Sequence, residues 1–88
     1  MKILIPTQFQ KVIKSSEIER NGKTVEEILT NLLIEFPELE GRLVNQEGKL
    51  NKFINIFVND ENINFLNDMK TELKDNDVIT ILPAIAGG

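Results

Sequence analysis

The last twelve residues of the chain read Asp77-Val78-Ile79-Thr80-Ile81-Leu82-Pro83-Ala84-Ile85-Ala86-Gly87-Gly88. The first half of this stretch is rich in β-branched residues, which predicts a β-strand over 77–82. Pro83 has no N–H group to donate to a neighbouring strand, so we expect the strand to end there and the chain to leave the domain. The residues beyond are small and end in two glycines, whose lack of a Cβ atom lets a backbone enter a narrow channel. The end of the chain therefore predicts a strand followed by a slender tail, 84–88.

Length and composition limit the classes of function open to the chain. Its 88 residues are 41% hydrophobic and 27% charged, an ordinary balance for one small globular domain. The absence of cysteine and histidine excludes disulfides, thiol and Ser-His nucleophiles and the common zinc sites, so we expect no metal and no bound cofactor. A net charge of −4 argues against nucleic acid and membrane partners. No apolar run is long enough for a signal peptide or a membrane span, so we expect a cytoplasmic protein.

An amphipathic helix is predicted over 25–36. Its apolar residues follow the spacing i, i+3, i+4, i+7, i+8 and i+11, which places on one stripe Val25, Ile28, Leu29, Leu32, Leu33 and Phe36. Thr24 can cap the helix, and Glu27 stands at the position that completes a capping box. Pro37 should end it, because the residue before a proline is pushed out of the helical region.

Strands are expected on both sides of this helix. The segments with strand-like character are 2–5, 15–20, 53–58, 63–65 and 77–82. The strongest is Phe53-Ile54-Asn55-Ile56-Phe57-Val58, and the cluster Asn59-Asp60-Glu61-Asn62 predicts a turn after it. We expect no regular structure around Phe9, Val12 and Ile13, and at most one helical turn in the long connection 38–50.

This order of elements predicts the fold class. Two strands, a crossover helix and further strands are typical of an α+β domain, here a mixed sheet of about five strands with one main helix on one face. We expect the domain to span residues 1–83 and to be followed by a flexible C-terminal tail over residues 84–88.

Alternation along the strands predicts which face of the sheet the helix covers. One face is wholly aliphatic and should lie beneath the helix: Ile3, Ile5, Ile54, Ile56, Val58, Ile79 and Ile81. The other face mixes polar and apolar residues: Leu4, Asn55, Phe57, Val78, Thr80 and Leu82. If this second face is open, Leu4, Phe57 and Leu82 are either a docking patch beside the tail or the scattered exposed apolar residues of any surface.

The order of strands and the Gly-Gly end resemble the ubiquitin-like β-grasp proteins. Within them the chain is similar to the prokaryotic sulfur carriers that include the small subunit of molybdopterin synthase and the thiamine-pathway carrier. The similarity rests on four stretches that together span most of the chain: 3–7, the helix from Thr24-Val25, 53–60 and 73–88. The sequences of residues 53–60 and 82–88 are most similar to those of carriers that serve cysteine synthesis. Asn76 is a departure, because these carriers often have glycine in that turn.

The resemblance implies a mechanism centred on the carboxylate of Gly88. A partner of the ubiquitin-activating type (an adenylyltransferase and sulfurtransferase) would use ATP to adenylate this carboxylate. Sulfur would then displace AMP, leaving a thiocarboxylate for a sulfur-acceptor enzyme. The protein itself would be a co-substrate rather than an enzyme. Threading into the partner would involve Gly87, Ala86, Ile85 and Ala84, and docking would involve Leu4, Phe57 and Leu82.

Three functions stay open on the sequence. The first is a sulfur carrier whose acceptor is a cysteine synthase-like enzyme or the large subunit of molybdopterin synthase. The second is a protein modifier whose tail is joined to lysines of target proteins. The third is an interaction domain with an inert tail, because fold alone does not determine function.

Overall fold

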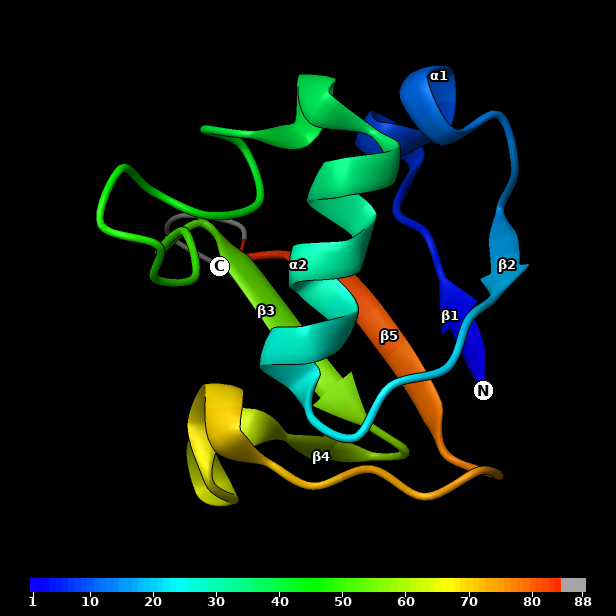
Figure 1. The fold of residues 1–88 in the computed structure, drawn as a ribbon, viewed down its shortest axis with the longest axis vertical. Helices are drawn as coiled ribbons and strands as arrows, with labels where there is room; N and C mark the ends of the chain where they lie inside the picture. The colour runs from blue at the N-terminus through cyan, green and yellow to red at the C-terminus, as the bar shows by residue number, and fades with distance from the viewer. Residues whose placement is uncertain (85–88) are drawn as a thin grey trace.

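The computed structural model describes residues 1–84 and contains a mixed five-stranded sheet with helices on one side (Figure 1). The strand order is β2-β1-β5-β3-β4, in which β1 and β5 are parallel and the other neighbours antiparallel. The bounds are β1 Lys2–Leu4, α1 Thr7–Ile13, β2 Glu17–Glu19, α2 Val25–Glu35, β3 Ile54–Val58, β4 Glu61–Asn62 and β5 Val78–Pro83. The predicted α+β class is confirmed, and β5 ends at Pro83 as expected.

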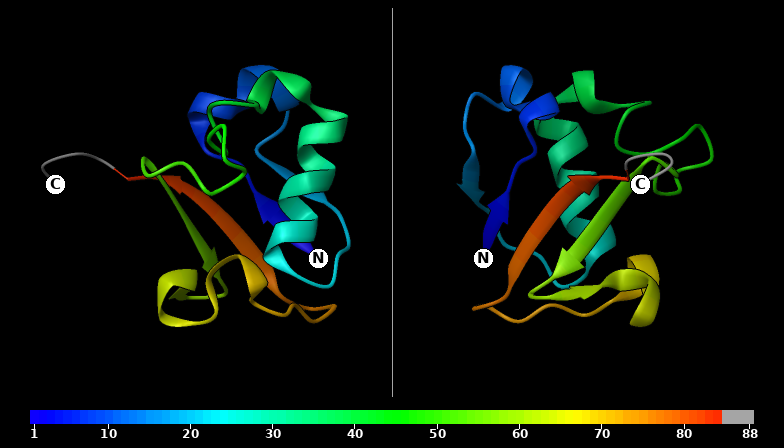
Figure 2. Two further views of the ribbon diagram at one scale, coloured as in Figure 1. Left: turned by 60° about the vertical axis from the view of Figure 1, so that its left-hand side comes forward. Right: turned by 180° about the vertical axis from the view of Figure 1, so that it is seen from behind.

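The helix α2 lies against the aliphatic face of the sheet (Figure 2). All seven residues predicted for this face are buried, and Ile3, Ile56 and Ile79 are wholly inaccessible, with 0% of their surface exposed. They pack against the buried stripe of α2: Val25, Ile28, Leu29 and Leu32. The alternation therefore predicted correctly which face of the sheet is buried. A register shifted by one residue would have exposed these isoleucines to water.

The predicted main helix is confirmed with nearly its expected bounds. Thr24 caps it, since its hydroxyl oxygen accepts a hydrogen bond from the Glu27 N–H at 3.2 Å. Glu26 and Glu27 lie in the first turn, where negative charge favours the positive end of the helix dipole. Pro37 stops α2 and starts a single 3₁₀ turn, Pro37–Leu39, which matches the one helical turn expected in the following connection.

The segment around Phe9 is a helix, so the expectation of no regular structure there is wrong. The helix α1 spans Thr7–Ile13 and buries Phe9 and Ile13 in the same core as α2. Phe9, Val12 and Ile13 have the helical spacing i, i+3, i+4, but a seven-residue segment shows this period only once. Its end also carries no glycine: Lys14 adopts the left-handed conformation, with φ 65°.

The predicted return strand over 63–65 is also wrong. The strand β4 is Glu61–Asn62, within the expected turn, and Ile63–Phe65 forms a 3₁₀ turn. The side-chain oxygen of Asn62 accepts a hydrogen bond from the Asn64 N–H at 2.9 Å, which starts this tight turn directly after β4. Ile63 is buried as its anchor, whereas Phe65 is 83% exposed.

The connection from α2 to β3 is anchored by Leu39, Leu43 and Val44, which are all buried. Gly41 and Gly48 adopt positive φ in its turns, a conformation that side chains disfavour. Within residues 1–84, no helix has the length and apolar character needed to cross a membrane.

Candidate functional site

The face of the sheet away from α2 gathers the three apolar residues predicted to share it. Thr80 of β5 lies between Leu4 of β1 and Phe57 of β3, paired in register with both. Leu82 lies two residues further along β5, opposite Asn55. Leu4 and Phe57 are half-buried and Leu82 is 42% exposed. The sheet thus brings Leu4, Phe57 and Leu82 together around Thr80 on a surface we call the open face.

The root of the C-terminal tail lies at one end of this face. The Ala84 N–H donates a 2.7 Å hydrogen bond to the Phe53 carbonyl oxygen, so pairing with the β3 side continues one residue past Pro83. Ala84 is half-buried. The predicted threading and reactive residues Ile85, Ala86, Gly87 and Gly88 lie outside the described residues.

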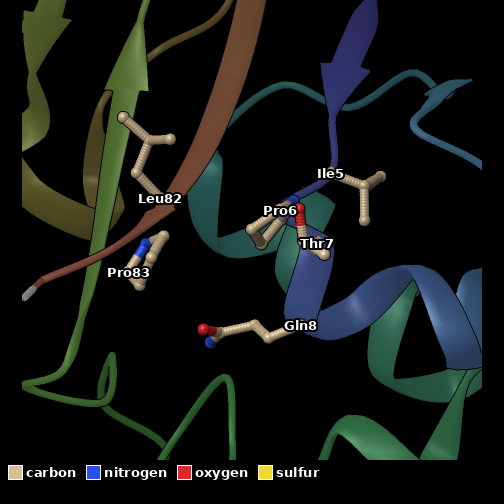
Figure 3. Close-up of a pocket in the computed structure, with 6 residues that line it drawn as sticks. All are labelled: Ile5, Pro6, Thr7, Gln8, Leu82 and Pro83. Carbon is tan, nitrogen blue, oxygen red and sulfur yellow. The ribbon is translucent and has the colours of Figure 1, made fainter.

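A depression of about 500 Å³ lies beside the tail root. It is lined by the junction of β1 and α1 and by the end of β5: Ile5, Pro6, Thr7, Gln8, Leu82 and Pro83. Figure 3 shows the Gln8 side chain extending toward Pro83, with the Leu82 side chain on the far side of Pro83. The lining is mainly apolar with one amide, which suits an apolar side chain of a partner together with one hydrogen bond.

The edge of β5 beside this depression is protected against pairing with another strand. Successive residues of a strand direct their N–H and C=O groups to opposite neighbours. Ala84 bonds toward β3, so the backbone of Pro83 faces the other side, where β1 has already ended at Leu4. Pro83 has no N–H, and this reduces the hazard of an unpaired edge.

The family-like residues Asn59 and Asp77 have a structural role at the opposite end of the sheet. Asn59 has φ 58° and ties the turn after β3 to the start of β5: its N–H donates to the Val78 carbonyl at 2.7 Å, and its side-chain oxygen accepts from the Val78 N–H at 3.1 Å. Asp77 accepts hydrogen bonds from the Lys74 N–H at 2.8 Å and the Asn59 amide at 3.1 Å. These two bonds hold the pKa of the Asp77 carboxyl below its ordinary value. Asn59 is the residue of this region that adopts the left-handed conformation. Asn76, at the position where the resembling carriers often have glycine, does not have a positive φ.

Sequence reasoning missed two parts of this site. The depression depends on α1, whose first turn supplies Thr7 and Gln8. The bond between Ala84 and Phe53 depends on the register of β3 against β5. Once that register is known, Phe53 is the residue opposite Ala84, but no local pattern in the sequence specifies it.

The chain is similar to a protein family and to several known proteins. Residues 3–88 match the ThiS family. The sulfur carrier protein CysO of Mycobacterium tuberculosis is 37% identical over 73 residues, covering 81% of this chain and 78% of the relative. The crystal structure of the Amycolatopsis orientalis BexX/CysO complex contains a chain that is 40% identical, with a TM-score of 0.87 and coverage of 99% of this chain and 98% of that one. Small archaeal modifier protein 3 of Haloferax volcanii is 34% identical over 65 residues, covering 74% of this chain and 70% of the relative.

Proposed function

This chain belongs to the ThiS family and is a ubiquitin-like β-grasp sulfur carrier, and from that premise we propose that its Gly88 carboxylate carries the sulfur. The observation that carries the proposal is that the family match extends through Gly88. Gly87 and Gly88 therefore lie within the residues that match the family.

The chemistry follows from the weakness of a carboxylate as an electrophile. A partner enzyme of the ubiquitin-activating type would attach AMP from ATP to the Gly88 carboxylate and release pyrophosphate. Sulfide would then attack the carbonyl carbon, so that a C–S bond forms and the bond to AMP breaks. With an enzyme persulfide as the donor, the product would be an acyl disulfide that a thiol then reduces. Either route ends in a C-terminal thiocarboxylate, a nucleophile that can transfer its sulfur to an acceptor enzyme.

The tail would deliver this group into a site that excludes water. An acyl-adenylate is hydrolysed by water, so the activating enzyme must enclose it. Gly87 and Gly88 allow close approach of protein on all sides, while Ala84, Ile85 and Ala86 would line the entry to the channel. The open face would be the docking surface next to this tail, because its residue Leu82 stands two residues before Ala84.

We propose cysteine biosynthesis as the pathway that receives the sulfur. The support is the similarity to two chains that are both called CysO, one a sulfur carrier protein and one determined in complex with BexX. The acceptor would then be a cysteine synthase-like enzyme. Thiocarboxylated protein mixed with that enzyme and its amino-acid substrate should gain the mass of cysteine on its Gly88 carbonyl, because the sulfur stays bonded to that carbon when it adds to the substrate. Hydrolysis of this bond should then release free cysteine, and the untreated protein should give neither product.

A second candidate function is supported by the similarity to a small archaeal modifier protein. In that case adenylation would begin in the same way, but a lysine amine of a target protein would attack in place of sulfur. The product would be an isopeptide bond rather than a thiocarboxylate.

The intact mass of the protein isolated from its own cells tests the proposal. We expect a fraction in which one terminal oxygen is replaced by sulfur, with the change located at Gly88 by fragmentation. Covalent ladders on target proteins, without the sulfur-bearing form, would support the modifier function. An unmodified mass under every growth condition, sulfur limitation included, would contradict both.

A further inference from the structure

The root of the tail is connected to the core by a chain of hydrogen bonds through Asn51. Ala84 is bonded to the carbonyl of Phe53, and the N–H of Phe53 donates to the side-chain oxygen of Asn51 at 2.9 Å. The backbone carbonyl of Asn51 also accepts from the Ile54 N–H at 3.0 Å. Asn51 therefore fixes Phe53, which directly precedes β3, and Ile54, which begins it, and with them the carbonyl that holds Ala84.

Asn51 is itself held from the other side by the connection between α2 and β3. Its side-chain amide donates to the Gly41 carbonyl at 3.2 Å, and its backbone N–H donates to the Leu43 carbonyl at 3.0 Å. Leu43 is completely buried, with 0% of its surface exposed. The side chain of Asn51 thus uses both of its ends, joining Phe53 to Gly41, while the backbone N–H of Asn51 connects this residue to Leu43 of the hydrophobic core.

We infer that Asn51 is a positioning residue for the sulfur-carrier reaction, because it fixes the point from which the reactive arm extends. This inference rests on the proposed role of Gly88. With Ala84 held, the arm consists of residues 85–88 and reaches at most about 14 Å. The reactive carboxylate is then separated from the fixed point by four residues rather than by a longer segment. Releasing Ala84 adds at least one residue to be ordered on binding, which weakens binding of the carrier without changing the chemistry at the carboxylate.

The Phe53 side chain offers a competing explanation for any effect at this place. Phe53 is 56% exposed, and the Lys52 ammonium lies 5.3 Å from the centre of its ring. A partner could therefore contact the ring directly. The positioning role assigned to Asn51 requires the backbone carbonyl of Phe53 and not its ring. Comparing Phe53→Ala with substitutions of Asn51 therefore separates positioning by Asn51 from direct contact between the partner and the ring.

The first experiment measures amide hydrogen exchange in the free protein. Asn51→Ala removes both side-chain bonds, whereas Asn51→Asp keeps an acceptor for Phe53 and loses the donor to Gly41. We expect exchange at Ala84 to accelerate about tenfold or more in Asn51→Ala and by a smaller factor in Asn51→Asp. The matched control is Asn45→Ala in the same loop, where the side-chain oxygen accepts from the N–H groups of Glu47 and Lys49. Unchanged protection at Ala84 in Asn51→Ala would overturn the inference.

The second experiment measures pyrophosphate exchange by the activating enzyme at increasing concentrations of each carrier variant. Asn51→Ala should raise KM for the carrier about 5–30-fold, the effect of ordering one further residue, and should leave kcat within about twofold. Asn51→Asp should recover part of the loss, Asn45→Ala should behave as the parent, and Phe53→Ala should raise KM less than Asn51→Ala. Each variant is melted in parallel, and Asn51→Asp carries the test if Asn51→Ala does not fold.

The outcomes separate this inference from the proposed function. An unchanged KM in Asn51→Asp and Asn51→Ala, together with loss of exchange on deletion of Gly88, overturns the role of Asn51 alone. A fall in kcat with unchanged KM also overturns it, because the arm would then be affecting the chemical step. Exchange that survives deletion of Gly88 overturns the proposed function instead.

Discussion

The two faces of the sheet are built from the same strands and differ in almost every physical respect. On the face beneath α2, Ile3, Ile56 and Ile79 are fully buried; on the open face, Leu82 is 42% exposed and Leu4 and Phe57 are half-buried. Neighbours in sequence such as Ile56 and Phe57 therefore belong to different environments. The difference teaches that one strand can stabilise the domain with every second residue and leave the intervening residues available for recognition.

The division between the faces also separates stability from chemistry. Complete burial of an aliphatic side chain contributes about 1.5–3 kcal/mol, and those contributions come from the covered face and its helix. The proposed reactive group, the Gly88 carboxylate, follows Ala84 by four residues in the sequence. Substitutions should therefore sort by face, and each of the following experiments either breaks or sharpens that comparison.

The largest effect on stability is expected from Ile56→Ala. The substitution leaves a cavity beneath α2 and should lower the free energy of unfolding by about 2–5 kcal/mol. Phe57→Ala on the adjacent position is the matched control, and it should lose less because its ring is only half-buried. Denaturant titration of both variants measures this. A larger loss in Phe57→Ala than in Ile56→Ala would mean that the faces have been assigned in reverse.

A charge on the open face should weaken partner binding. Phe57→Asp and Leu82→Asp are each expected to raise the Kd for the activating enzyme about tenfold or more, or about 1.4 kcal/mol, because an apolar contact is replaced by a carboxylate that must be desolvated. Both variants should remain folded, because neither side chain belongs to the buried core, and each should lose less stability than Ile56→Ala. Titration calorimetry with the activating enzyme measures the affinity. Parent-like affinity in Leu82→Asp, the more exposed position, would show that the open face does not dock.

A smaller effect is expected at the end of the sheet that holds Asn59 and Asp77. The folded-state pKa of Asp77 is lowered by its bonds to Lys74 and Asn59, so its stabilising contribution is present above the unfolded pKa and is lost as pH falls through the folded value. Asp77→Asn should therefore be less stable by at most about 1 kcal/mol at neutral pH, because solvent screens these bonds. The difference should shrink as pH falls below about 4 and vanish only below the lowered folded-state pKa of Asp77. Urea titrations from pH 7 to pH 2 measure this. Asp75→Asn, the same change at an exposed neighbour, is the matched control and should leave the free energy of unfolding near that of the parent at pH 7.

The smallest effect is expected from Phe65→Asp. Phe65 is 83% exposed in the turn after β4 and lies on neither the covered face nor the open face. The change should alter the free energy of unfolding by less than about 0.5 kcal/mol and leave affinity for the activating enzyme unchanged. It is thus the matched control for Phe57→Asp, with the same substitution at an aromatic residue elsewhere. Weakened binding in Phe65→Asp would extend the docking surface beyond the open face.

The elements predicted best from the sequence are those in which the pattern of buried residues repeats several times. The aliphatic alternation of 54–58 and the stripe of 25–36 repeat often enough to specify both an element and its inward face. Shorter elements were missed or displaced. The helix α1 shows its period once, and the side-chain bond of Asn62 turned an apparent strand over 63–65 into a 3₁₀ turn.

The candidate site could be predicted only in part for the same reason. Alternation placed Leu4, Phe57 and Leu82 on one face, and the structure confirms that they share it. The bonds of Asn51 to Phe53 and Gly41 could not be predicted from the sequence, because hydrogen bonds between side chains and backbone in a polar loop produce no periodic pattern of residues. The depression beside Pro83 depends on α1, so it was missed together with that helix.

The central claim is that the Gly88 carboxylate is the group that the partner activates. The most direct test is pyrophosphate exchange with the cognate activating enzyme, run on the parent, on the protein lacking Gly88 and on Gly87→Val, with a melting curve for each. We predict that both variants lose pyrophosphate exchange. Deletion of Gly88 moves the terminal carboxylate back by one residue, and Gly87→Val puts a β-branched side chain where the partner's channel would admit only glycine. Their melting temperatures should match the parent, because the core lies within residues 1–84. Undiminished exchange by the protein lacking Gly88 would contradict the claim.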